Sequence, residues 1–191
     1  MTQCRCSLSA RTGHYYVDSK KLPVCHNLRI HSHKVFEGIA SRGKGSIGWF
    51  FDLKLHLVIN QHGQLARFLL TPANVADNNH RVLSYLFQGL RGKCYGDRGY
   101  LSCLIEELLQ EGLHLVIKVR KNMLLTLQDK LNLMKRGGIE AVNDILMTVC
   151  DIDQTRHRNP LNALVHILSG LTAYTFLDNQ NRRFDLARAL A

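Results

Sequence analysis

The order of the expected elements predicts an α/β protein with a mixed sheet and helices packed against it. Three strands, two of them joined in a hairpin, occupy the first part of the chain, and helices then alternate with further strands. This order is typical of one sheet covered by helices. Of the 191 residues, 46% are hydrophobic and 21% are charged, which are values of a globular domain with a full core.

Alternating hydrophobicity defines the first three strands. The first begins at His14–Val17. Residues Cys25–Gly48 are basic, rich in Gly, Ser and His, and without periodicity, so they are predicted to form a surface loop. The segment Trp49–Asn60 alternates, and after a polar turn Leu65–Leu70 completes a hairpin. The predicted polar face of the longer strand carries Lys54, His56 and Asn60.

Helical periodicity and capping residues define the second part. The predicted helices are Asn79–Leu90, capped by Asp77 or Asn78, then a helix from Ser102 to Gly112, then Leu124–Met134, Ile139–Val149 and Asn159–Phe176. The predicted strands between them are Lys93–Asp97 and His114–Val119. Gly137 and Gly138 are expected to break or kink the helical pattern.

The charge balance points to an anionic partner. The chain has 25 Lys and Arg against 15 Asp and Glu, a net charge of +10, and the excess is largest in the first 60 residues. Nucleic acid is the commonest partner of such a protein, although an ordinary basic protein is the alternative. No apolar run is long enough for a transmembrane helix, and the N-terminus lacks a signal-peptide core. We therefore expect a cytoplasmic protein.

The cysteines favour reduced thiols over disulfides. They are Cys4, Cys6, Cys25, Cys94, Cys103 and Cys150. The chain has no secretion signal and enough hydrophobic residues for a core, so disulfide bonds are not needed to stabilise it. The Cys and His pairs near the N-terminus lack the spacing of a structural zinc site, so zinc is disfavoured.

Three acidic residues lie at the ends of predicted elements. Asp18 and Asp97 end short strands, and Glu140 opens a helix. Sheets of this class bind ligands at the carboxyl ends of their strands. Three converging carboxylates repel one another unless divalent cations neutralise them, and Mg²⁺ suits such a site because it takes carboxylate oxygens, water and phosphate. Taken singly, each acid is explained more simply as a helix cap or a solvated strand end.

Several segments, in order, resemble the DDE-type transposases of bacterial insertion sequences. The resemblance covers about residues 15–176. The similar segments are Tyr16–His26 with the first aspartate, Gly48–Asn60, Thr71–Asp77 and Tyr95–Tyr100 with the second aspartate, Arg136–Asp144 with the glutamate, and Thr155–Arg158.

The resemblance implies a ribonuclease-H-like (retroviral-integrase-like) fold, a mixed sheet flanked by helices. Carried over residue by residue, Asp18, Asp97 and Glu140 become the catalytic and metal-binding triad, which would hold two Mg²⁺ or Mn²⁺ ions. The implied function is DNA strand cleavage and strand transfer in the transposition of an insertion sequence, a form of DNA recombination. The implied partners are transposon ends, target DNA and a second copy in a homodimer, with no membrane, in the nucleoid-associated part of the bacterial cytoplasm.

Basic side chains around the triad are candidate phosphate contacts. The candidates are Lys20, Lys21, Arg29, Lys34, Arg42, Lys44, Arg98, Arg136, Arg156 and Arg158. Each is also explained as solvated surface charge. Trp49, Phe50 and Phe51 have the chemistry to stack on bases, but burial in the strand core is the favoured interpretation.

The chain departs from the family pattern in ways that favour a second hypothesis. Leu133 stands where a tyrosine is usual, Met147 stands where a lysine is usual, and Asp52 replaces a small residue. The expected organisation is a poorly ordered lead at 1–14, a DDE catalytic domain at 15–176 and a polar tail at 177–191. The helical DNA-binding segment usual in the family is missing from that lead.

Two alternatives therefore remain beside an active transposase domain. One is a truncated, catalytically impaired remnant that binds DNA or interferes with an intact transposase. The other is a ribonuclease-H-like nuclease that acts on another nucleic acid.

Overall fold

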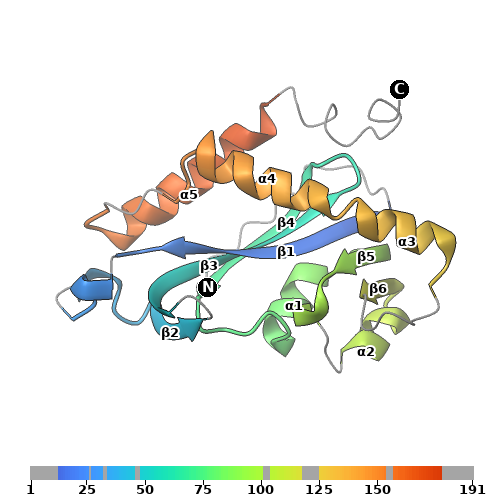
Figure 1. Ribbon diagram of the computed structural model, residues 1–191, viewed down its shortest axis with the longest axis horizontal. Coiled ribbons are helices and arrows are strands. Elements are labelled where there is room, and N and C mark those ends of the chain that lie inside the picture. Colours follow the sequence, from blue (N-terminus) through green and yellow to red (C-terminus); the bar gives the residue numbers. More distant parts are fainter. Residues whose placement is uncertain are drawn as a thin grey trace.

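A mixed sheet with helices on both faces forms the protein in the computed structural model (Figure 1). The structure describes residues 13–25, 27–31, 34–45, 48–100, 104–117, 125–153 and 157–177. Within these ranges six strands make one sheet. No helix in the described residues is both long and apolar enough to cross a lipid bilayer.

The strands are β1 (His14–Pro23), β2 (Ser41–Gly45), β3 (Gly48–Asn60), β4 (Leu65–Pro72), β5 (Gly92–Gly96) and β6 (Leu113–Ile117). Strand β1 lies at the centre of the sheet, between β3 and β5. β1 pairs antiparallel with β3 and parallel with β5, and β5 pairs parallel with β6. The long β3 pairs with β2 through its first residues and with β4 through the remainder, both antiparallel. This arrangement is α/β and ribonuclease-H-like, as the sequence predicted.

The helices divide between the two faces of the sheet (Figure 1). They are α1 (His80–Phe87), α2 (Ile105–Gln110), α3 (Leu127–Met134), α4 (Gly137–Thr148) and α5 (Pro160–Thr175). One core joins Tyr15 and Val17 of β1 to α1 and α2, and the other joins Tyr16 to α4 and α5. Successive strand residues point to opposite faces, so the next even residue, Asp18, lies on the α4 side.

The predicted loop at Cys25–Gly48 is wrong in its described part. It contains two short 3-10 helices, Asn27–Arg29 and Lys34–Phe36, followed by β2. Phe36 and Ala40 are buried in the α4-side core. Elements of three to five residues are too short to show a hydrophobic period, so the sequence pattern does not reveal them.

The polar face predicted for β3 is buried instead of solvated. Lys54, His56 and Asn60 are at most 8% exposed, because strands cover both edges of β3 and helices cover both of its faces. The side chain of Asn60 forms its hydrogen bonds within the adjacent turn. Its side-chain oxygen accepts from the backbone N–H groups of His62 and Gln64 at 2.9 and 3.0 Å, and so shapes the hairpin turn.

The structure corrects the predicted cap of α1 and confirms the predicted break before α4. Asn79, and neither Asp77 nor Asn78, caps α1, because its side chain accepts from the backbone N–H groups of the first turn. Gly137 and Gly138 begin α4 after the short connection from α3. The prediction for α5 is confirmed, with Asn159 as the cap and proline in the first turn. The predicted helix start at Ser102 and the chain ends fall outside the described residues.

Candidate active site

The predicted strand end at Asp18 is wrong: β1 continues to Pro23, so Asp18 lies in the middle of the strand, where α4 crosses the sheet. Its Oδ2 accepts a hydrogen bond of 2.9 Å from Nδ2 of Asn143. Asn143 is buried on α4, one turn after Glu140, and its own Oδ1 has no hydrogen-bond partner. The amide therefore fixes the orientation of the carboxylate and leaves a buried oxygen acceptor beside it.

The three predicted acids converge in space. Burial raises the pKa of Asp18, whereas the backbone N–H of Ser19 and the guanidinium of Arg136 lower it. The negative charges of Asp97 and Glu140 raise it further. Mutual repulsion of this kind requires that the carboxylates lie near one another. Asp18 on β1, Asp97 directly after β5 and Glu140 on α4 therefore lie near enough for their charges to interact, although they are distant in sequence.

Arg136 stands between two of these acids. Its Nη2 donates to Oε1 of Glu140 at 3.2 Å, and its Nη1 lies 3.8 Å from Oδ2 of Asp97. The Arg136 side chain is 25% exposed, and the two acids are about half exposed or more. A guanidinium therefore supplies the positive charge between these acids, at the start of the helix that carries Glu140.

Glycine allows the loop after β5 to fold tightly around Asp97. Oδ1 of Asp97 accepts from the backbone N–H of Gly99 at 2.8 Å. A Cβ on Gly99 would lie 3.0 Å from that oxygen and 3.5 Å from Oδ2 of Asp77. A side chain at this position would crowd the Asp97 oxygen and only touch Asp77, so Gly99 leaves room for the Asp97 carboxylate.

The donor set suits a divalent cation. Carboxylate and amide oxygens are hard ligands of the kind that Mg²⁺ and Mn²⁺ prefer, and the partnerless Oδ1 of Asn143 adds one such oxygen. Within the described ranges, no three His, Cys, Asp or Glu side chains are grouped closely enough to hold a metal ion. The guanidinium of Arg136 lies between Asp97 and Glu140 and neutralises part of their charge.

Asp77 is a further polar residue beside this site, and the sequence identified it only as a helix cap. Its Oδ1 accepts from Oγ of Ser19 at 2.8 Å and from Nζ of Lys54 at 3.2 Å. Nδ1 of His56 lies 3.7 Å from the same oxygen. Burial lowers the pKa of His56 to about 4, so the imidazole is neutral at pH 7 and this contact is not an ion pair. No local pattern in the sequence could have revealed this cluster.

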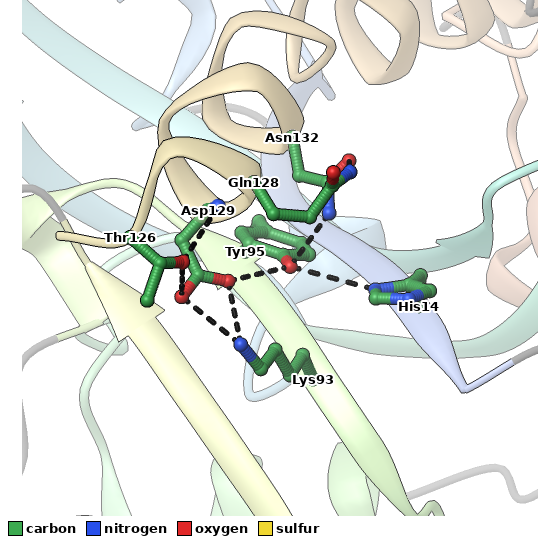
Figure 2. Close-up of polar contacts among 7 residues, drawn as sticks. All are labelled: His14, Lys93, Tyr95, Thr126, Gln128, Asp129 and Asn132. Carbon is green, nitrogen blue, oxygen red and sulfur yellow. Dashed lines mark hydrogen bonds and ion pairs between the residues drawn. The ribbon is translucent and has the colours of Figure 1, made fainter.

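A second buried cluster attaches α3 to β5 (Figure 2). Nζ of Lys93 donates to both oxygens of Asp129 at 2.8 and 3.0 Å, and Tyr95 donates to Oδ1 at 3.0 Å. Asn132 in turn donates to the Tyr95 hydroxyl at 2.8 Å. α3 leads directly into Arg136 and α4. The cluster therefore fixes the start of the helix that carries Glu140 against the strand that ends before Asp97.

Comparison with known proteins identifies the family. The profile described as "Transposase DDE domain" matches residues 8–160, most of the chain. The chain belongs to the transposase DDE domain family. Among the curated proteins and among the solved structures, no match is found.

In this transposase domain the predicted phosphate contacts are scattered. Arg98 follows Asp97 directly, Arg136 is held by the acids, and Lys20 lies two residues beyond Asp18 on the same strand. The remaining described candidates are exposed on β1, the 3-10 helices, β2 and the segment before α5: Lys21, Arg29, Lys34, Arg42, Lys44 and Arg158. Arg156 lies outside the described residues.

The structure shows where the three residues that depart from the family pattern lie. Leu133 and Met147 are partly buried and pack against the core beneath α4. Asp52 is buried in β3, on the opposite sheet face from Asp18, where burial raises its pKa and the charge of Lys21 lowers it. Asp52 therefore adds no charge to the triad side of the sheet.

Proposed function

We propose that this chain is the catalytic domain of a DNA transposase, which cleaves and joins phosphodiester bonds with divalent metal ions. The observation that carries the proposal is the convergence of Asp18, Asp97 and Glu140 from β1, β5 and α4 in a member of the transposase DDE domain family. Phosphoryl transfer needs charge neutralisation and positioning more than a reactive side chain, and carboxylates that hold cations supply both.

The three acids share one part in this proposal, and Asn143 supports them. Asp18, Asp97 and Glu140 hold the ions, and the Oδ1 of Asn143 is available as a further oxygen ligand. When bound, a pair of Mg²⁺ or Mn²⁺ ions activates the attacking oxygen and stabilises the leaving oxygen. Asn143 keeps the Asp18 carboxylate in one orientation through its 2.9 Å hydrogen bond.

Arg136 is a counter-ion that must exchange partners. Its guanidinium lies between Asp97 and Glu140. If these two acids held a divalent ion, Arg136 would lose its partners, and its fork of N–H donors would suit a DNA phosphate. This exchange reconciles the predicted DNA contact of Arg136 with the ion pairs in the structure.

The exposed basic residues on β1, β2 and the segment before α5 bind phosphates in this proposal. Such contacts are independent of sequence and weaken as salt rises. Assembly as a homodimer on two DNA ends belongs to the same proposal.

A cleavage assay tests the proposed activity. Purified protein is incubated with supercoiled plasmid and Mn²⁺, and nicked and joined products are counted. Asp97→Asn should lose cleavage by at least a hundredfold, because a metal ligand is removed. Glu111→Gln, an exposed acid between α2 and β6, is the matched control and should cleave as the parent does. Equal cleavage by the parent and Asp97→Asn would contradict the proposal.

One observation favours the second candidate, a DNA-binding remnant with impaired catalysis. Between Gly137 and Thr148, α4 carries no lysine or arginine, and Met147 is partly buried where the family pattern has a lysine. Metal binding and DNA binding without detectable cleavage would support this candidate.

A further inference from the structure

The aromatic residue predicted to lie in the core is on the surface. Trp49, at the start of β3, is 50% exposed. The guanidinium of Arg42 lies 4.5 Å from the centroid of the indole ring, and Nζ of Lys44 lies 5.8 Å from it. Lys44 is also the direct cross-strand partner of Trp49. Two cations from β2 therefore flank one exposed ring.

A pocket of about 380 Å³ adjoins this ring, and Arg42 belongs to both. Its polar walls come from His31, Lys34 and Ser41 together with Arg42, and Glu37 contributes one negative charge. Sites for small ligands occupy about 300–1,000 Å³, so the pocket has room for one nucleotide.

The chemistry of this surface selects an unpaired nucleotide. Bases stack on exposed aromatic rings in a way that tolerates any sequence, and cations beside the ring hold the backbone. A base in a duplex has both faces covered by its neighbours, so it cannot stack on a protein ring. Because Arg42 already lies over the indole ring, it can donate N–H groups to a phosphate with little further loss of side-chain freedom.

The surface is separate from the carboxylate site. Asp18 pairs with Leu57, and Trp49 is eight positions earlier on β3, about 25 Å away along the strand at 3.3 Å per residue. A nucleotide in the pocket is therefore not the one that reacts at the acids.

We propose that Trp49, Arg42, Lys44 and the adjoining pocket bind an unpaired nucleotide of a DNA strand several nucleotides from the reacting phosphodiester. The base stacks on the exposed part of Trp49, and Arg42 and Lys34 hold its phosphate. The inference rests on the proposed function for the identity of the polymer as DNA.

Trp49 is the chain's single tryptophan, so its fluorescence reports on this surface directly. The probe is a five-nucleotide oligodeoxythymidylate, titrated into the whole chain in the presence of EDTA. Binding should quench the fluorescence. Arg42→Ala should weaken binding about tenfold, as expected for one lost charged hydrogen bond. Arg91→Ala removes the same charge just before β5 and should change affinity less than about twofold.

A labelled oligonucleotide and anisotropy extend the test to the ring itself. Trp49→Ala should lose about five- to hundredfold in affinity, the range for one base stacked on an aromatic side chain. Trp49→Phe keeps a ring and should bind within about threefold of the parent. Circular dichroism confirms that each variant is folded.

Three results would overturn the inference: no quenching, equal weakening by Arg42→Ala and Arg91→Ala, or equal quenching by a blunt-ended duplex long enough to stay fully paired. The titration contains no divalent metal, so it does not depend on the carboxylates. Failure to bind Mn²⁺ would contradict the proposed function and leave a positive fluorescence result standing.

Discussion

Two clusters of the same chemical groups behave differently because their burial differs. In the α3 cluster, Lys93 and Asp129 form an ion pair whose carboxylate is 6% exposed. In the candidate active site, Arg136 joins Asp97 and Glu140, which are 49% and 61% exposed. In the first cluster the buried carboxylate of Asp129 accepts hydrogen bonds from Lys93, Tyr95 and Thr126, which suits a fixed attachment. The second is open to solvent, and its longer contacts of 3.2 and 3.8 Å suit the exchange of Arg136 for a metal ion that we propose.

The largest expected effect comes from breaking the Lys93–Asp129 cluster. Asp129→Ala leaves Lys93, Tyr95 and Thr126 without their shared acceptor. We expect the free energy of unfolding to fall by about 3 kcal/mol, the lower end for breaking a buried ion pair, because Lys93 is partly exposed. Arg136→Ala should change it by less than about 1 kcal/mol, as for a surface pair. Urea denaturation measures both, and equal losses would contradict the contrast.

The stability that the Lys93–Asp129 cluster contributes should also depend on pH. Burial by itself raises the pKa of Asp129, but hydrogen bonds from Lys93, Thr126 and Tyr95 lower it to about 2. The folded pKa lies below the unfolded value near 3.9, so the stabilisation is present above pH 4 and is lost as pH falls from about 4 to 2. Parent and Asp129→Ala should therefore differ less in stability at pH 2.5 than at pH 6. A constant difference would show that Asp129 does not titrate in this range.

The candidate active site, in contrast, should respond to divalent metal ions. Arg136→Gln removes the cation that competes for Asp97 and Glu140, so the affinity for Mn²⁺ should rise about fivefold, the scale of an exposed ion pair. Binding to DNA should weaken in the same variant. Unchanged Mn²⁺ affinity in the folded variant would show that the guanidinium does not occupy the metal position. Lys135→Gln, a neighbouring charge, is the matched control.

Local signals in the sequence predict much of this fold. The alternation in β3 and β4, and the asparagine–proline start of α5, are properties of neighbouring residues, and the structure confirms those elements. The burial of Lys54 and His56 and the short β2 could not be predicted in this way. They depend on covering by distant segments, which no period in the sequence encodes.

Some residues of the candidate site could likewise be predicted from the sequence, and others could not. The predicted strand ends indicated Asp18 and Asp97, although Asp18 lies in mid-strand in the structure, and the resemblance to a family completed the triad with Glu140. Asn143 and Asp77 were missed, because a buried amide and an acid near a helix start look like ordinary structural residues. Their contacts with Asp18 and Ser19 join residues 125 and 58 positions apart.

Calorimetric titration of the purified chain with Mn²⁺ tests the central claim most directly, namely that Asp18, Asp97 and Glu140 assemble to hold divalent cations. The account predicts that the parent binds Mn²⁺, that Asp18→Asn, Asp97→Asn and Glu140→Gln each weaken binding at least tenfold, and that Glu111→Gln does not. Absence of binding by the folded parent, or equal binding by all four variants, would contradict it.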